Sequence, residues 1–415
     1  PHPVVEQLEG AAGHACGHCL PGVCMSLCEA YESGRELLAG EAIGQTIGNL
    51  CRCTGYQPFR DALIVSLRDR AKEGGSPTAL AERLPKRFSG VAPMAYRDRE
   101  GAVFYRPATS LEALRLRHAH PEARLVAGGT SRGWTGAGEE ESAGAATRLI
   151  SLEAVAELGG FSRDDERWTV GAGVTIATFA ERLQDEFPMV TAMAERFGSP
   201  QIRNRATVGG NLVSAAHHSD LISVLLALGA ELRIESLEGA RQLPLDKFFV
   251  GFRQTELGEG ELLAAVYIPR GEPVGSEANI AHRVSAFYKV SKRRSLDRAI
   301  ANAAFLVELD GDRIVRRARL AFGGVAAYGA RAYEAESLLE GKKWEPKSAQ
   351  AVAALLKEIF PASSDQRATA AFRNALVAGL WQKFFAEHRN PEQPMFADAA
   401  LRRFYRRPVV GPVQD

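Results

Sequence analysis

Apolar residues in the first seventy positions recur at helical spacing. Cys24, Leu27, Cys28 and Tyr31 fall at i, i+3, i+4 and i+7. Side chains at these offsets share one face of a helix, so residues 1–73 are predicted to form a small all-α domain. A buried thiol behaves as a small apolar side chain, and we expect Cys24 and Cys28 to belong to the core.

The helical period is lost after residue 73. Residues 74–95 mix Gly, Pro, Ser and charged residues without regular spacing, which is typical of a linker. Short strand-like runs with glycine-rich turns then predict an α+β domain at 96–275, with helices near 110–118 and 221–228. The runs are RLVAGGTS, RWTVGAGVTI, RNRATVGGNLVSAA, AELRIES and LLAAVYIP. Residues 134–147 have no period and are expected to form a mobile loop.

A third region begins near residue 280. The strand-like runs RVSAFYKV and RIVRRARLAFGGVAA are followed by helical patterns, and the last pattern repeats an apolar residue every four positions. These positions are Phe372, Leu376, Leu380 and Phe384. Such a stripe indicates a helix with one face buried against a sheet. We expect a small α+β domain at 280–392 and a tail at 393–415, which makes the whole chain multidomain α+β.

Composition narrows the range of partners. The 415 residues suffice for two or three domains. With 51 basic and 50 acidic residues the net charge is +1, so no excess charge points to nucleic acid or to an anionic membrane. The apolar runs are much shorter than the roughly 20 residues of a membrane span, and PHPVVEQLEG does not resemble a secretory signal. We expect a cytoplasmic protein with no nucleic acid and no membrane as partner.

All six cysteines lie in the predicted helical domain. Cys16 and Cys19 form C-x2-C, and Cys51 and Cys53 form C-x-C. Disulfide bonds are disfavoured, because cysteines this close in sequence rarely bridge and no secretory signal is present. Two pairs of thiolates can instead converge on a zinc ion or on a [2Fe-2S] cluster, in which each iron takes two thiolates. The spacing alone leaves both alternatives open.

Two glycine pairs stand beside small polar residues. The first lies in LVAGGTS, residues 125–131, and the second in ATVGGNLVSAAHHSD, residues 206–220. Paired glycines let backbone N–H groups turn toward one point, which suits a diphosphate, although a plain hairpin turn has the same pattern. Neither loop matches the glycine pattern of a Rossmann fold or a P-loop. His217 and His218 are expected on the loop surface, with side chains pointing apart, rather than at a metal.

Together these motifs resemble the molybdenum hydroxylase family, and in particular the [2Fe-2S]/FAD small subunit of xanthine dehydrogenases. CGHCLPGV and NLCRCTGY are similar to the family's cluster motifs, AGGTS and TVGGN to its FAD motifs, and AFGGVAA and SSDQRATAAFR to its C-terminal flavoprotein domain. The resemblance implies a helical [2Fe-2S] domain, an α+β FAD-binding domain and a small α+β C-terminal domain. It implies that the cluster ligands are Cys16, Cys19, Cys51 and Cys53.

The resemblance also implies the residues of an FAD site. Phe197 would stack on the isoalloxazine ring, Leu263 would touch the flavin region or the adenine, and Lys289 would reach the flavin. The remaining FAD contacts would be Leu125, Ala127, Gly128, Gly129, Thr130, Ser131, Thr207, Gly210, Asn211, Ser214 and Asp220. The basic turn at 292–294 is either solvated or meets the phosphates of NAD.

By this resemblance the chain is an electron-transfer subunit. Electrons from a molybdenum-cofactor-binding large subunit, which oxidises a purine, would pass through the [2Fe-2S] cluster to FAD and then to NAD, in a heterotetramer or higher assembly. No catalytic residue of this chain is expected beyond the flavin site. Two alternatives stay open: a subunit of another molybdenum hydroxylase acting on aldehydes or N-heterocycles, and a non-redox, zinc-stabilised partner-binding protein.

The sequence departs from the family pattern at two points, which concern the contact with the molybdenum cofactor and a second [2Fe-2S] domain. Ala15 stands where family members commonly carry a Gln that lies toward the molybdenum cofactor, so this contact is expected to differ. A ferredoxin-like [2Fe-2S] domain usually precedes the motifs found here, and we expect it on a missing segment or on a separate chain.

Overall fold

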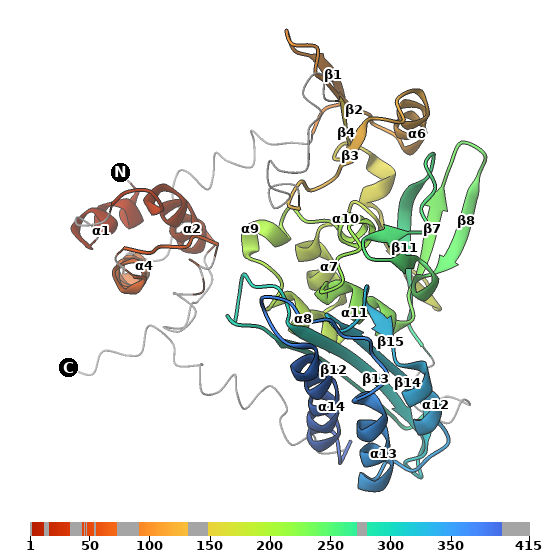
Figure 1. The fold of residues 1–415 in the computed structure, drawn as a ribbon. Coiled ribbons are helices and arrows are strands. Elements are labelled where there is room, and N and C mark those ends of the chain that lie inside the picture. The colour runs from red at the N-terminus through yellow and green to blue at the C-terminus, as the bar shows by residue number, and fades with distance from the viewer. Residues whose placement is uncertain are drawn as a thin grey trace, which may run out of the picture. The chain divides into compact units, whose positions relative to one another are not determined.

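The computed structural model describes residues 2–11, 16–33, 44, 46, 48–53, 55–72, 91–131, 148–271 and 280–391. The chain divides into two compact units, residues 1–90 with 396–415 and residues 91–395, and each is described by itself (Figure 1). Ala15, the loop predicted at 134–147, the tail at 393–415 and most of the predicted linker lie outside the described ranges.

The first unit contains three described helices around a small core. They are α1 (Pro3–Ala11), α2 (Leu20–Glu32) and α4 (Gln57–Lys72). Pro21 lies in the first turn of α2, where a missing N–H costs no hydrogen bond. Cys28 is buried in the core with Leu27 and Phe59, and Cys24 packs against its edge. The helical stripe predicted from the sequence is confirmed, whereas the all-α character of the whole domain stays a prediction.

The second unit begins with a four-stranded sheet in the order β1-β2-β4-β3. Strand β4 runs parallel to β2 and β3, and a helix covers the sheet where residues 110–118 predicted one. The elements are β1 (Met94–Arg97), β2 (Val103–Arg106), α6 (Ser110–Ala119), β3 (Arg124–Val126) and β4 (Arg148–Ser151). Strand β3 leads directly into the first glycine pair, at residues 128 and 129.

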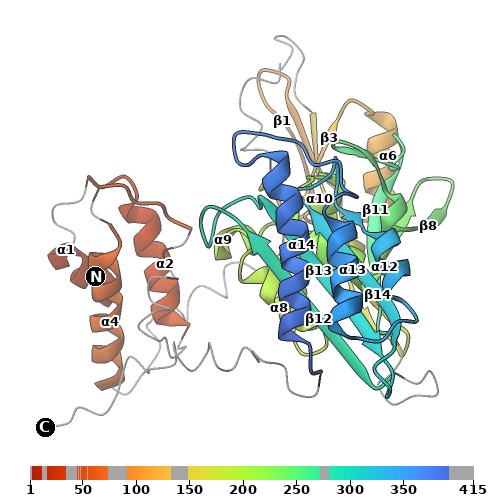
Figure 2. The same ribbon diagram turned by 60° about the horizontal axis from the view of Figure 1, so that its bottom comes forward.

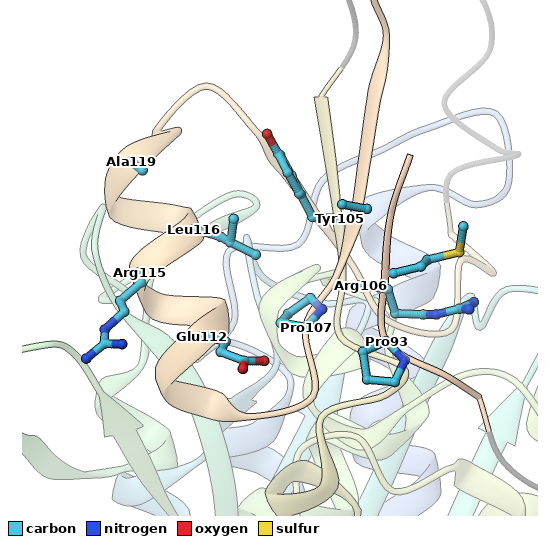
Figure 3. A pocket seen from close by; sticks show the side chains of 10 residues that line it. Pro93, Tyr105, Arg106, Pro107, Glu112, Arg115, Leu116 and Ala119 are labelled. Atoms are coloured by element: carbon cyan, nitrogen blue, oxygen red, sulfur yellow. The ribbon is translucent and has the colours of Figure 1, made fainter. Parts of the chain in front are cut away.

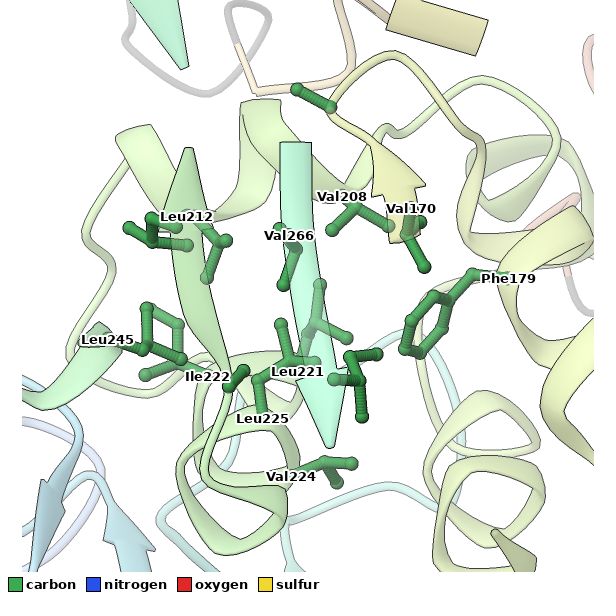
Figure 4. Packing of buried hydrophobic residues seen from close by; sticks show 14 of the residues in the cluster. Val170, Phe179, Val208, Leu212, Leu221, Ile222, Val224, Leu225, Leu245 and Val266 are labelled. Atoms are coloured by element: carbon green, nitrogen blue, oxygen red, sulfur yellow. The ribbon is translucent and has the colours of Figure 1, made fainter. Parts of the chain in front are cut away.

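A five-stranded antiparallel sheet follows, in the order β5-β6-β11-β7-β8. Its strands are β5 (Phe161–Arg163), β6 (Arg167–Gly171), β7 (Glu231–Glu235), β8 (Ala240–Pro244) and β11 (Leu262–Pro269). Near it lie η2 (Ala156–Gly159), α7 (Ile176–Leu183), α8 (Pro188–Ala194), α9 (Pro200–Arg203), α10 (Val208–Val213), α11 (Asp220–Leu228) and η3 (Leu245–Lys247). Side chains of α10 and α11 pack around Val266 of the central strand β11 (Figure 4).

The third sheet is antiparallel, in the order β12-β13-β14-β15. Its elements are β12 (His282–Val290), β13 (Ala301–Leu309), β14 (Val315–Gly323), β15 (Ala330–Arg331), α12 (Tyr333–Leu339), α13 (Pro346–Leu356) and α14 (Ala370–Glu387). Helices α12, α13 and α14 cover one face (Figure 2), while α8 and α11 contact the sheet from the five-stranded side. Every residue of β13 is buried, because alternate side chains enter different cores: Phe305 packs under the helical layer, and Leu306 packs toward α11.

Two sequence predictions need correction. The run RNRATVGGNLV, residues 203–213, is predicted as strand-like with a glycine turn, but it begins at the last residue of α9 and continues into α10, with Gly209 inside α10. In α14 the predicted stripe is buried only at its C-terminal end: Phe372 is 47% exposed and Phe384 is fully buried. A four-residue step advances about 400° around a helix of 3.6 residues per turn, so the stripe rotates by about 40° at each step. Among the helices in the described part of the chain, none is long and apolar enough to cross a membrane.

Candidate functional site

A pocket of about 650 Å³ in the second unit brings the two glycine loops together. Its wall also includes β11, the segment between α8 and α9, and residues that follow β12 in the C-terminal sheet. All fourteen residues predicted for FAD line this pocket. The sequence motifs therefore converge on one cavity, with Lys289 reaching it from the third sheet.

The first glycine loop presents a row of backbone N–H groups. Gly129 has φ of +70°, a conformation that glycine adopts without strain. Within the described residues, the backbone N–H groups of Ala127, Gly128, Gly129, Thr130 and Ser131 have no hydrogen-bond partner. Ala127, Gly128 and Thr130 are half-buried, whereas Gly129 and Ser131 are exposed, and a backbone donor removed from water needs an acceptor. Successive N–H groups in a turn form a concavity suited to phosphate oxygens, so these residues fit the diphosphate of FAD.

Gly128 has a different role from Gly129. A Cβ atom placed on Gly128 would lie 1.8 Å from the backbone oxygen of Arg205, just before the second loop. No side chain fits at that distance, so the two loops touch through their backbones. The first glycine of this pair is therefore required by loop packing, whichever ligand binds.

The second loop is held in shape by its own polar side chains. Thr207 caps α10, and its Oγ1 accepts a hydrogen bond from Gly210 N at 3.0 Å. Ser214 Oγ donates to Asn211 O at 2.7 Å, and Asn211 Oδ1 accepts from Ser219 Oγ at 2.6 Å. No partner in the described part of the chain bonds the side-chain amide nitrogen of Asn211. Asn211 therefore keeps its NH2 group for a ligand, while Thr207 and Ser214 are already partly engaged.

Asp220 and Lys289 form a buried ion pair at the pocket wall. Lys289 Nζ donates to Asp220 Oδ2 at 2.6 Å and to Arg196 O at 3.0 Å. Burial raises the pKa of the Asp220 carboxyl, while the neighbouring Lys289 acts in the opposite direction. An ammonium group has three donors, and the third finds no acceptor among the described residues. Since Lys289 lines the pocket, this donor is available to a ligand.

Phe197 and Leu263 supply apolar surface to the same pocket. Phe197 is half-buried in the turn between α8 and α9, and its backbone oxygen accepts from Arg203 Nη1 at 2.9 Å. Leu263 is almost fully buried in β11, where its pairing with β7 is interrupted by an irregularity. A half-exposed aromatic ring can stack on a planar group, whereas Leu263 also serves the core.

Phe252 and His217 each precede a residue that lines the pocket, Arg253 and His218. A hairpin of β9 (Phe249–Gly251) and β10 (Gln254–Thr255) carries Phe252, which is 58% exposed. The ring of Phe252 lies 5.6 Å from that of His217. His217 also contacts the ring of His218 edge-on at 4.8 Å, which corrects the expectation that their side chains point apart: they lie on an irregular loop, not on an extended strand.

Burial and nearby positive charges both lower the pKa of His218. Burial lowers its pKa to about 3, and His217, Arg298, Arg367 and Lys289 add to this effect because they disfavour a further positive charge. Because its pKa is this low, His218 is neutral near pH 7. Its side chain belongs to the lining of the pocket. This placement was not expected, since the sequence indicated only a surface loop.

Several lining residues have no motif that identifies them in the sequence. Arg293 belongs to the basic turn considered for NAD phosphates, whereas Arg253, Arg298 and Arg367 were not singled out. Arg367 Nη1 lies 3.0 Å from Asp297 Oδ1 across 70 residues of sequence. A contact of this range depends on the fold of the C-terminal part of the chain and not on local sequence.

The four predicted cluster ligands lie close together in the first unit. Cys53 Sγ is 3.6 Å from Cys16 Sγ and 3.9 Å from Cys51 Sγ. Hydrogen bonds from the backbone and side chain of His18 lower the pKa of Cys16, whereas burial and the nearby Cys51 raise the pKa of Cys19. Among the described residues, no group of three or more His, Cys, Asp or Glu side chains is arranged around a single ion. Four thiols in one place are the number that a two-iron cluster takes as ligands.

A second hollow of about 570 Å³ lies between β1 and α6 (Figure 3). Its floor includes Pro93, Tyr105 and Leu116, with Glu112 and Arg115 at the side. The Glu112 carboxylate accepts a hydrogen bond from the backbone of Ala108, which gives it a local structural role. None of the predicted site residues lines this hollow.

Three families match successive parts of the chain. Residues 1–64 match the [2Fe-2S] binding domain. Residues 96–271 match the FAD binding domain in molybdopterin dehydrogenase, and residues 286–388 match the CO dehydrogenase flavoprotein C-terminal domain.

Curated relatives align with nearly the whole chain. Xanthine dehydrogenase 2 of Arabidopsis thaliana is 28% identical over 453 residues, which cover 92% of this chain and 33% of the relative. Aldehyde oxidase 2 of Macaca fascicularis is also 28% identical, over 93% of this chain and 32% of the relative. The chain thus spans about a third of the length of these relatives.

Solved structures share the fold over about seven tenths of the chain. Carbon monoxide dehydrogenase from Hydrogenophaga pseudoflava matches with a TM-score of 0.61 and 24% identity, over 71% of this chain and 96% of that chain. Quinoline 2-oxidoreductase from Pseudomonas putida 86 matches with a TM-score of 0.62 and 24% identity, over 74% of this chain and all of that chain.

Proposed function

Since the chain is an FAD and [2Fe-2S] module of the molybdenum hydroxylase family, we propose that it is the electron-transfer subunit of a xanthine dehydrogenase-like enzyme. It takes electrons from the molybdenum site of a large partner subunit and delivers them to NAD in the cytoplasm. The observation that carries this proposal is the pocket shared by the two glycine loops, in which five backbone N–H groups of the first loop have no partner among the described residues. When bound, the cluster supplies one-electron transfer and FAD supplies hydride transfer.

The chain's residues hold FAD by two kinds of contact. The N–H groups of the first loop and the Asn211 amide bind the diphosphate and neighbouring hydroxyls. Phe197 stacks on the isoalloxazine ring, and the third donor of Lys289 bonds to its polar edge. A positive charge at that edge favours extra electron density on the ring.

The part of the pocket near Arg253 and Arg293 is the proposed NAD site. Both residues line the pocket, and guanidinium groups can pair with phosphates. Phe252 and His217, which precede the lining residues Arg253 and His218, offer aromatic surface to a planar ring. His218, which is neutral, can form a hydrogen bond with the bound nucleotide without adding a positive charge to the pocket.

Cys16, Cys19, Cys51 and Cys53 are the proposed ligands of the [2Fe-2S] cluster. The partner is proposed to be a molybdenum-cofactor-binding large subunit in a heterotetramer or higher assembly. A second candidate function has an observation in its favour: an aldehyde oxidase matches at the same 28% identity as a xanthine dehydrogenase. The substrate of the partner is then an aldehyde or an N-heterocycle, and the work of this chain is unchanged.

Cofactor stoichiometry tests the proposal. Purified chain is expected to contain two irons and one FAD, with broad cluster absorption beneath flavin bands. Anaerobic addition of NADH is expected to bleach the flavin bands. Zinc in place of iron, together with no bound flavin, would contradict the redox function, while intact flavin bands after NADH addition would contradict only the NAD assignment.

A further inference from the structure

A fully buried amide lies behind the Asp220–Lys289 pair. Asn302 is in β13 and has no exposed surface. Its Nδ2 donates to Asp220 Oδ1 at 3.0 Å and to His218 O at 3.2 Å, while its Oδ1 accepts from Ser223 Oγ at 2.6 Å. Each polar atom of this side chain is therefore bonded, and all of its partners belong to the segment 218–223.

Only one orientation of this amide satisfies its surroundings. Turning it by 180° would place Oδ1 against a carboxylate and a carbonyl oxygen, which are both acceptors, and would leave two strong acceptors without a donor. Gly323 on the neighbouring strand leaves the space for the amide, since a Cβ there would lie 2.6 Å from Asn302 Oδ1. The hydrogen bonds and the available space therefore hold the Asn302 side chain in one orientation.

Asn302 and Lys289 divide the two oxygens of one carboxylate. Asn302 holds Oδ1 of Asp220, and Lys289 holds Oδ2. A carboxylate bonded on both oxygens cannot rotate about its terminal bond. Its fixed plane sets the direction from which the ammonium group approaches, and this in turn directs the remaining Lys289 donor into the pocket.

We infer that Asn302, supported by Ser223, is a positioning residue for the flavin site that acts through Asp220 on Lys289. The inference rests on the proposed function, because it concerns FAD in this pocket. Nothing in the sequence marked Asn302, which stands among small apolar residues in IANAAF.

A double-mutant cycle on the full chain tests the inference. Apo-protein is titrated with FAD, and binding is followed by quenching of flavin fluorescence. N302L is expected to weaken FAD binding about tenfold, since a hydrogen bond to a charged group is lost. The single variant K289M is expected to weaken FAD binding more than N302L does. The double variant N302L/K289M should bind no worse than K289M, because Asn302 acts through Lys289.

The control is N374L, the same substitution in α14, outside the pocket lining, at a half-buried amide whose Oδ1 has no partner in the described structure. It should leave FAD affinity unchanged. A second readout is the midpoint potential of bound FAD, which should shift negative in N302L but not in N374L, because a displaced ammonium group stabilises added electrons less.

S223A covers the case in which a bulkier variant does not fold. It removes only the hydroxyl donor to Asn302 and should weaken FAD binding about threefold, with a potential shift of the same sign. Wild-type affinity and potential in both N302L and S223A would overturn the inference, as would losses in N302L and K289M that multiply in the double variant. Failure of the wild-type chain to bind FAD would instead refute the proposed function.

Discussion

Lys289 Nζ lies 2.6 Å from Asp220 Oδ2, and both side chains are almost entirely buried although 69 residues separate them. Removing one member leaves the other charge buried without its partner. K289M is therefore expected to lower the free energy of unfolding of the apo-chain by about 3 to 5 kcal/mol, measured by urea denaturation. Adding D220N to K289M should recover part of the loss. Equal stability of K289M and wild type would show that the pair is dispensable.

Gly128 is expected to tolerate no side chain. A Cβ there would lie 1.8 Å from Arg205 O, so G128A must separate the two glycine loops and should abolish measurable FAD binding. G159A is the control, because a Cβ at Gly159 meets nothing within 4 Å. Isothermal titration with FAD compares the two variants. If G128A bound FAD as tightly as G159A does, the close approach of the loops would not matter for the site.

His218 should make stability depend on acid. Its pKa is about 3 in the folded chain, below the ordinary value of 6.5, so the unfolded state takes up a proton first as the pH falls. Stability should therefore decrease as the pH falls from about 6.5 toward 3, with a slope of up to about 1.4 kcal/mol per pH unit from this group.

The variant H218N isolates this contribution, since it removes the titrating ring. Urea denaturation at several pH values should give a shallower decline for H218N than for wild type below pH 6.5. His217, Arg298, Arg367 and Lys289 stay in both proteins, so their effects cancel in the difference. Parallel curves would mean that His218 titrates normally.

The cysteines should separate into ligands and core. C53S is expected to lose the iron of the purified chain, whereas C28A should keep two irons per chain and lose about 1 to 2 kcal/mol of stability from a small cavity in the core. Iron and sulfide analysis, with the visible spectrum, distinguishes the two. Retention of full iron by C53S, or its loss in C28A, would redraw the ligand set.

Local motifs predicted the parts of the pocket that one loop can form by itself. Residues 125–131 and 206–220 carry their glycines and small polar side chains in short segments, so their role could be read without a structure. The helix α10 could not be predicted from the sequence, because Gly209 resembles a turn residue. Only the close approach of Gly209 to Ala172, where its N–H donates at 2.8 Å, explains a glycine inside that helix.

Residues brought to the pocket by packing between distant segments could not be predicted. Arg367 reads as a surface charge and Asn302 as an interruption in an apolar strand. Arg367 lines the pocket, and Asn302 bonds Asp220 of the pocket wall, in a structure where the third sheet packs against α11. No local spacing in the sequence encodes that arrangement, and Lys289 is the residue of this sheet that the family resemblance assigned to the flavin site.

Strand β13 contributes side chains to two cores at once, and α11 has all nine of its residues buried. A fragment that ended near residue 275 would retain both glycine loops but would leave the apolar surface of α11 open to water. Such a fragment should aggregate rather than bind a nucleotide weakly. The two domains are therefore expected to fold only together, so that neither can be studied as an isolated fragment.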